Sequence, residues 1–228
     1  MNRDIGPFRV RGTKVISPYP TQLTPAEHRL IFSLQKVFAP EHILADCYLP
    51  KPDRQVSSCR NAQFSAPKVL TTSDLLQIDC LTVDQRGIFI FESKDYVGWI
   101  YGHGNRVHWT QVSAYGQNKH QFYNPIRQNS SHLDAIAAIF GNLVPLYSII
   151  VFGREATLKV IADVPEHCYV CTQGNLLSVL KTISSTRSAF SVTQITDIVA
   201  KLNASRIDPT TIIRDQHVQE ITAHQPQK

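Results

Sequence analysis

The sequence has few of the features that mark membrane, secreted and disulfide-rich proteins. It contains no apolar run that approaches the ~18 residues of a membrane-spanning helix. Its first residues lack the apolar core of a secretory signal, and its five cysteines are an odd number in a chain of 228 residues. We therefore expect a soluble, cytoplasmic protein that folds without a disulfide framework and has no membrane partner.

Charge and metal-binding thiols are also sparse. Lys and Arg exceed Asp and Glu by 23 to 18, which gives a formal net charge of +5, and no dense block of basic residues is present. This balance permits a polyanionic partner without requiring one. Cys168 and Cys171 have the CxxC spacing, but no second CxxC or HxxxH completes a four-ligand site. We expect buried thiols on or beside a strand, with a zinc-dependent regulator as the alternative.

Helical and extended patterns alternate along the chain, which favours an α/β fold with a mixed central β-sheet flanked by helices. The sequence predicts an extended lead-in over residues 1–23 and a single domain over 24–222, with a polar loop or insertion at about 50–73. Residues 223–228 are predicted to form a loose tail. A capping box, Thr24 to Glu27, opens the first helix, which Pro40 stops. Further helices are predicted over 125–140, 176–183 and 192–202, and strands over 76–83, 88–91, 98–101, 107–109, 146–152, 160–161 and 169–170.

The first two of these strands predict a hairpin with a defined register. A four-residue turn over 84–87 pairs Val83 with Ile88, and the antiparallel register then places Asp79 opposite Glu92. Strand alternation puts Lys94 on the same face as Glu92. A slip of one residue would put the two acids on opposite faces, so the register is a specific prediction.

Two directly opposed carboxylates need a cation, a shared proton or solvent to relieve their repulsion. A divalent ion meets that need, because Mg²⁺ takes oxygen ligands from one or two carboxylates, water and a substrate phosphate. Lys94 on the same face could position a water molecule or stabilise developing negative charge. These residues alone leave open a surface cluster in which Lys94 neutralises Asp79 and Glu92.

The hairpin and the segments after it resemble the nuclease-related domain family, often called NERD, of the PD-(D/E)xK nuclease superfamily. The resemblance rests on residues 77–79, 87–94, 98–102, 109–111 and 124–129, with His132-Leu133 after them. The family usually has His at the position of Cys80 and Thr at the position of Ser93. On the predicted alternation both side chains point away from the carboxylates, so neither difference removes a proposed ligand.

This resemblance implies a restriction-endonuclease-like fold and a Mg²⁺-dependent nuclease, with Mn²⁺ as a possible substitute. The enzyme would hydrolyse phosphodiester bonds of nucleic acid, DNA rather than RNA, by attack of an activated water. The alternative is a non-catalytic nucleic-acid-binding or adaptor module that retains the fold. Asp79 and Glu92 would bind the metal, Lys94 would assist the water, and Gln128 would lie beside the site on a helix.

Other residues are assigned less directly. The backbone carbonyl of Ser93 and the side chain of Glu27 are further candidate metal ligands, although the capping box alone explains Glu27. Gln128 could equally be a polar residue at a helix start, and His132, one turn later, is expected on a solvated helix face. Trp99, Tyr101 and Trp109 could stack on bases, but packing in the core or sheet is the expected role. The candidate phosphate contacts are Lys68, Arg86, Lys119 and Arg127.

Overall fold

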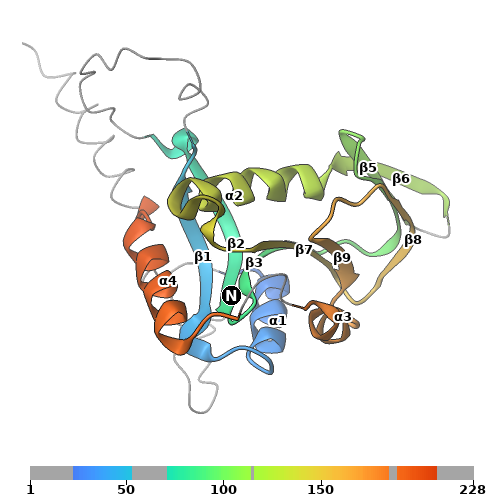
Figure 1. Cartoon of the computed structure of the whole chain (residues 1–228). Coiled ribbons are helices and arrows are strands. Elements are labelled where there is room, and N and C mark those ends of the chain that lie inside the picture. The colour runs from blue at the N-terminus through green and yellow to red at the C-terminus, as the bar shows by residue number, and fades with distance from the viewer. Residues whose placement is uncertain (1–22, 53–70, 114–115, 185–188, 210–228) are drawn as a thin grey trace, which may run out of the picture.

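Two β-sheets with helices around them make up the described residues, 23–52, 71–113, 116–184 and 189–209, of this computed structural model (Figure 1). Short turns of 3₁₀ helix are η1 (Pro40–His42), η2 (Thr72–Asp74) and η4 (Gly141–Leu143). The α-helices are α1 (Pro25–Leu34), α2 (Pro125–Phe140), α3 (Leu176–Thr182) and α4 (Val192–Ser205). The strands are β1 (Ile43–Pro50), β2 (Leu75–Asp84), β3 (Gly87–Lys94), β4 (Gly98–His103), β5 (His108–Ser113), β6 (Asn118–Tyr123), β7 (Leu146–Phe152), β8 (Ala156–Ala162) and β9 (Cys168–Thr172).

The larger sheet has the order β1-β2-β3-β7-β9, antiparallel from β1 to β3 and parallel from β3 to β9. Helices α1 and α3 pack on one face and α2 and α4 on the other, so the central strands β3 and β7 are buried on both sides. Continuous apolar sequences such as those of β3 and β7 suit this position. This mixed α/β arrangement confirms the expected fold class and is consistent with a restriction-endonuclease-like fold.

The predicted register of β2 and β3 is confirmed. Val83 pairs with Ile88 and Leu81 with Ile90, and the ladder continues to Cys80 and Phe91. The connecting turn is closed by Asp84, whose Oδ1 accepts a hydrogen bond of 2.7 Å from the Arg86 amide. The turn therefore sets which β2 residue lies beside which β3 residue at the far end of the hairpin.

A smaller, second sheet with the order β6-β5-β4-β8 was not predicted as a separate layer. Its inner face buries Ile100, Trp109 and Phe122 against Phe152 of the first sheet. The hairpin of β4 and β5 matches the prediction, whereas β6 was missed because Asn118–Tyr123 is mostly polar and mostly exposed. In Figure 1 this sheet forms the end of the molecule where β5, β6 and β8 are labelled.

Asn124 joins the second sheet to α2. Its Oδ1 caps the helix by accepting from the Ile126 amide at 2.9 Å. Its Nδ2 donates to three carbonyl oxygens of the β4–β5 turn, including that of Arg106 at 2.7 Å. An Asn at this position satisfies a free amide at the helix N-terminus, and here it also fixes the helix start relative to the sheet.

The capping box of α1 and the helices near residues 125–140, 176–183 and 192–202 are confirmed. Strand β1 was missed, and the polar stretch predicted at about 50–73 lies largely outside the described residues, as do the lead-in and the tail. In the part of the chain that the structure describes, no helix has the length and apolarity needed to cross a membrane.

Gly102 lies in close contact with Trp109, so a larger residue at position 102 should destabilise the fold. A Cβ at position 102 would lie 2.4 Å from Cδ2 of Trp109, whose indole is 1% exposed and stacks on Phe152. We expect Gly102→Ala to lower the free energy of unfolding by about 1–3 kcal/mol, because the indole has no free volume to move into. Urea unfolding measures this change.

Gly174→Ala is the matched control, because its Cβ would meet only Thr172 Oγ1, at an ordinary 3.6 Å. Its free energy of unfolding should stay within about 0.5 kcal/mol of the wild type. Equal stability of the two variants would contradict the tight packing between the second sheet and the first.

Candidate functional site

Two carboxylates meet where β2 and β3 separate. The ladder's last pair is Cys80 and Phe91, and Asp79 and Glu92 are the next residues on the two strands. Asp79 Oδ2 accepts a hydrogen bond of 2.7 Å from the Ser93 amide. The Asp79 side chain thus takes the Ser93 N–H, a backbone donor of β3 that a neighbouring strand would otherwise use. This hydrogen bond holds the Asp79 carboxylate against β3 beside Glu92.

A break in β1 accompanies this separation. Asp46 has a φ of 46°, and it is the residue omitted from an otherwise regular β1–β2 register, directly across from Asp79. Ala45 packs with the α1 side of the sheet, whereas Cys47 packs with the α2 side, so the side-chain alternation changes phase at Asp46. Asp79 therefore lies at an irregular point of the sheet, where backbone ladders are interrupted and side chains can meet.

Glu92 is the most deeply buried acidic side chain of the site, at 2% exposed. Its Oε1 forms an ion pair with Lys94 Nζ at 2.7 Å. Its Oε2 is buried without a hydrogen-bond partner among the described residues, and His132 Nδ1 is 3.8 Å away from it. A buried oxygen left without a partner is costly, so this atom marks a position where a cation would be stabilised.

Helix α2 supplies the other side of the site through Gln128 and His132, which are one turn apart. Gln128 Oε1 accepts a hydrogen bond of 3.0 Å from Lys94 Nζ. The ammonium of Lys94 is therefore held between the Glu92 carboxylate and the Gln128 amide. This pairing fixes the ammonium at the rim of the site.

Asn129 orients the buried His132. Its Nδ2 donates to Ile90 O at 3.0 Å and to Ser148 Oγ at 2.8 Å, so its Oδ1 is left to accept from His132 Nδ1 at 3.0 Å. The imidazole therefore carries its proton on Nδ1. The expectation that His132 lies on a solvated helix face is wrong, because its side chain is buried between α2 and β3.

Burial in the site disfavours the ionised forms of Asp79 and Glu92. Burial, followed by the charge of Glu92, raises the pKa of Asp79 from 3.8 to about 7, although the Ser93 amide opposes the shift. Burial also raises the pKa of Glu92, against the opposing effect of Lys94. Burial, with the nearby Lys94 ammonium, lowers the pKa of His132 to about 4, which keeps the imidazole neutral.

The donor atoms fit a hard divalent cation. The site offers the carboxylates of Asp79 and Glu92, and one of their oxygens, Glu92 Oε2, has no hydrogen-bond partner among the described residues. Nowhere in the described ranges do three or more His, Cys, Asp or Glu side chains gather as a metal-binding group. Two carboxylates completed by water and substrate oxygens are the coordination that suits Mg²⁺, whereas a closed structural zinc site needs four protein ligands.

The two further candidate metal ligands are the side chain of Glu27 and the backbone carbonyl of Ser93. Glu27 Oε2 accepts a hydrogen bond from the Thr24 amide at 2.6 Å, as a capping box requires. Its charge nevertheless contributes to raising the pKa of Asp79 and of Glu92, so it lies within electrostatic reach of the pair. The amide of Ser93 is used by Asp79, and a role for the Ser93 carbonyl stays a prediction.

Of the predicted phosphate contacts, Arg86 has its guanidinium engaged in contacts within the fold. Its guanidinium pairs with Asp84 and donates to Leu180 O and Ile183 O at the end of α3. Lys119 and Arg127 are exposed, on β6 and at the start of α2, and the Arg127 guanidinium donates to Asn105 O at 3.0 Å. Lys68 lies outside the described residues.

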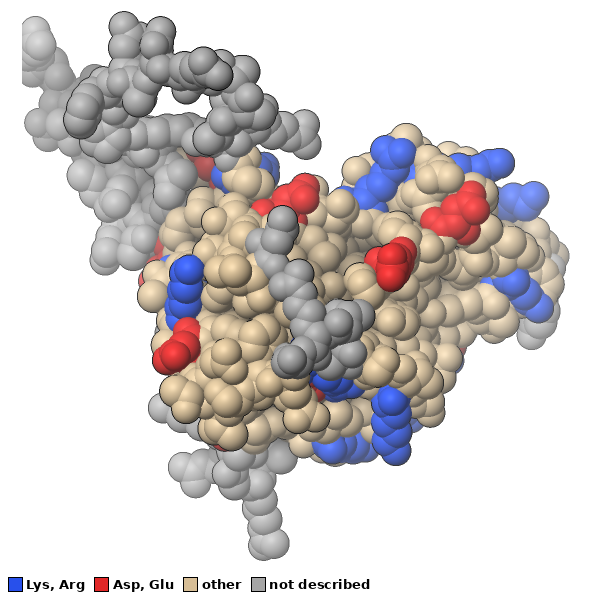
Figure 2. Space-filling model, viewed as in Figure 1, with Lys and Arg blue, Asp and Glu red and all other residues tan. Residues whose placement is uncertain are grey.

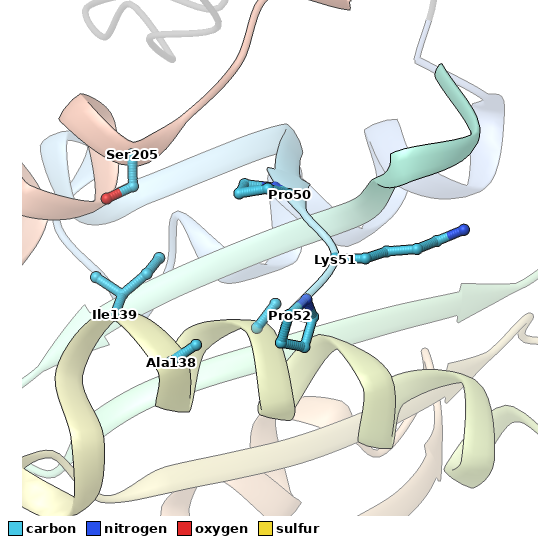
Figure 3. Close-up of a pocket in the computed structure, with 7 residues that line it drawn as sticks. Pro50, Lys51, Pro52, Ala138, Ile139 and Ser205 are labelled. Carbon is cyan, nitrogen blue, oxygen red and sulfur yellow. The ribbon is translucent and has the colours of Figure 1, made fainter. Parts of the chain in front are cut away.

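Two other features are separate from the carboxylates. Figure 3 shows a largely apolar pocket beside α2, lined by Pro50, Lys51, Pro52, Ala138, Ile139 and Ser205 among others, which contains none of the site residues. Burial raises the pKa of both Cys168 and Cys171, so these thiols are uncharged. Cys171 packs in the core beside α1, and Cys168 Sγ donates to Ser148 Oγ, as expected for buried strand cysteines.

Asn129 and His132 are the site residues whose role the sequence reasoning missed. The available signal was the position of His132, four residues after Gln128 and three after Asn129, because residues three and four positions apart share a helix face. The partners that give them a role, Ile90 O and Ser148 Oγ, come from β3 and β7 and have no local sequence signature.

Comparisons with known proteins identify the family of the chain. An uncharacterized protein of Bacillus anthracis is 36% identical over 86 residues, which cover 38% of this chain and 40% of that protein. The aligned part thus spans less than half of the length of that relative. No solved structure matches the chain significantly. The family model of the nuclease-related domain matches residues 24–153, which include both carboxylates, Lys94, Gln128 and His132. The chain therefore belongs to the nuclease-related domain family.

Proposed function

We propose that this protein is a cytoplasmic, metal-dependent nuclease that hydrolyses phosphodiester bonds of nucleic acid, with DNA as the preferred substrate. The observation that carries the proposal is the convergence of Asp79 and Glu92 at one end of the β2–β3 hairpin, with one buried Glu92 oxygen lacking a partner. Membership of the nuclease-related domain family supports a nucleic-acid substrate.

Asp79 and Glu92 would hold Mg²⁺, or Mn²⁺ in its place, through their carboxylate oxygens. When bound, the ion would polarise the scissile phosphate and lower the pKa of a water molecule. A bound cation would favour the ionised form of both carboxylates, against the raised pKa values that burial gives them.

Lys94 would act on the attacking water and on the phosphate. Its ammonium is held 2.7 Å from Glu92 Oε1 and 3.0 Å from Gln128 Oε1, so its position is fixed before substrate arrives. A fixed cation beside a reacting phosphate stabilises charge that develops in the transition state. Gln128 is then a positioning residue for the ammonium, and Asn129 and His132 line the buried side of Glu92.

The alternative is a module that binds nucleic acid without cleaving it. Such a module has no chemical need for two carboxylates that disfavour each other's charge, which is why the nuclease is preferred. The two functions differ in cleavage: the nuclease should cleave with Mg²⁺ and stop cleaving in EDTA, whereas a non-catalytic module should bind without cleaving under either condition.

The first test is cleavage of labelled DNA and RNA with and without Mg²⁺. We expect Glu92→Gln, Asp79→Asn and Lys94→Ala each to lower the cleavage rate by about 100-fold or more, because each removes a group that acts on the transition state. The rates are measured on denaturing gels under single-turnover conditions.

Asp134→Asn and Lys181→Ala are matched controls, because both side chains are exposed on helices outside the site. Their cleavage rates should equal that of the wild type. Equal cleavage by the wild type and Lys94→Ala would assign the activity to another site or to a contaminant.

The raised pKa of Asp79 predicts a pH dependence of stability. A carboxyl whose pKa is higher in the folded state favours folding when protonated, so its contribution is lost as pH rises from about 4 towards about 7. Without metal, the free energy of unfolding of the wild type should fall over this interval, by up to about 4 kcal/mol. Asp79→Asn should flatten the profile, measured by urea unfolding at several pH values.

Added Mg²⁺ should stabilise the wild type more at pH 8 than at pH 5, because it binds the ionised carboxylates. Asp134→Asn should keep the wild-type profile. A profile of Asp79→Asn that parallels the wild type would show that Asp79 titrates at an ordinary pKa.

A further inference from the structure

The outer face of the second sheet carries two exposed aromatic side chains, Trp99 and Tyr123, and the half-buried Tyr101. On β4, Ile100 points into the core, so Trp99 and Tyr101 point outward. The register puts Val160 beside Tyr101, and His108 beside Tyr123, on this same face. Trp99 is 41% exposed, Tyr123 50% and Val160 57%. Trp99 therefore lies outside the core, on the outer face of the sheet, whereas Trp109 packs in the core.

Two lysines share this outer face. Lys119 lies opposite Val112 in the register, and Val112 lies opposite Trp99. Lys159 falls at the irregularity between β4 and β8, where its Nζ lies 4.8 Å from the centre of the Trp99 ring. Lysine over an exposed indole is attracted by the ring face, and its long stem lets the ammonium move to a nearby anion.

The strands of the second sheet contain no acidic residue. Their sequences include His103, His108, Lys119, His120 and Lys159 as titratable bases, but neither Asp nor Glu. The nearest acids in sequence, Glu155 and Asp163, flank β8, and Asp163 pairs with His103 Nε2 at 2.9 Å. Figure 2 shows Lys and Arg side chains at the end of the molecule where β5, β6 and β8 lie, with acidic side chains also visible there.

The outer face is connected closely to the carboxylate site. Trp99 follows Lys94 by five residues, which span at most about 18 Å of extended chain. At the other end of the sheet, Tyr123 precedes the Asn124 cap, and Gln128 follows in the first turn of α2. A polymer bound on this face would therefore have a neighbouring segment within reach of Asp79 and Glu92.

We propose that the outer face of the β6-β5-β4-β8 sheet binds single-stranded nucleic acid, with bases stacked on Trp99, Tyr101 and Tyr123 and phosphates on Lys119 and Lys159. This inference rests on the proposed function and names its substrate class. Exposed aromatic faces favour unpaired bases, because bases within a duplex already stack on one another. A base on Trp99 takes the place of the Lys159 ammonium, which moves to the adjacent phosphate. The outer face thus selects nucleic-acid strands whose bases are unpaired.

The test is binding of a fluorescein-labelled single strand of about 20 nucleotides, longer than the ~4–16 that such surfaces cover, measured by anisotropy in EDTA. Trp99→Ala and Tyr123→Ala should each weaken binding roughly 5- to 100-fold, and Trp99→Phe should weaken it less. The single strand should quench part of the tryptophan fluorescence of the wild type but not of Trp99→Phe, whose remaining Trp109 is buried. A duplex of the same length should bind more weakly and quench less.

Matched controls come from a similar pair on another surface, Phe32 on α1 and Lys36 in the turn that follows it. Phe32 is 54% exposed, and Lys36 Nζ lies 5.0 Å from the centre of its ring. Phe32→Ala and Lys36→Ala should leave binding unchanged. Replacing both Lys119 and Lys159 by alanine should reduce the slope of log affinity against log salt, by about 0.7 for each lysine removed.

Several outcomes would overturn the inference. These are wild-type affinity in Trp99→Ala, duplex binding as tight as single-strand binding, or a wild-type dimer that Trp99→Ala dissociates without any loss of binding. The test is independent of cleavage, since it is run in EDTA. Normal binding without cleavage would contradict the nuclease proposal alone, and cleavage unaffected by Trp99→Ala would contradict the surface alone.

Discussion

The burial of the Glu92 carboxylate between β3 and α2 is the constraint on which the rest of the site depends. Removing a carboxylate from water costs several kcal/mol unless charged or hydrogen-bonding partners replace the lost hydration. Lys94 replaces it for one oxygen, and the other oxygen has no partner among the described residues. Helix α2 completes this arrangement, because Gln128 accepts a hydrogen bond from the Lys94 ammonium and His132 lies on the buried side of Glu92.

The remainder of the fold holds these groups in place through α2 and β3. Asn124 ties the start of α2 to the second sheet, and Asn129 ties its second turn to Ile90 and Ser148 of the first sheet. The break at Asp46 lets Asp79 leave the ladder and accept from the Ser93 amide. The carboxylate site, α2 and the second sheet are therefore linked by side-chain hydrogen bonds, most of them to backbone atoms, and such bonds tolerate little displacement.

The hairpin was predictable because its information is local. The turn over 84–87 and the apolar pattern set the β2–β3 register, which in turn placed Asp79 near Glu92. The α1 capping box and the Asn124 helix start were likewise readable from adjacent residues. Strand β6 was not, because its polar sequence forms a strand only through pairing with β5. The burial of His132 and the exposure of Trp99 depend on which elements cover them, and neither has a signal in the local sequence.

The central claim is that Asp79 and Glu92 together bind one divalent ion, and a crystal structure grown with Mn²⁺ tests it most directly. The account predicts an anomalous peak between the two carboxylates, within coordination distance of Glu92 Oε2 and of an Asp79 oxygen. A Mn²⁺-containing crystal without that peak, with the Lys94–Glu92 ion pair intact and Glu92 Oε2 still lacking a partner, would contradict it.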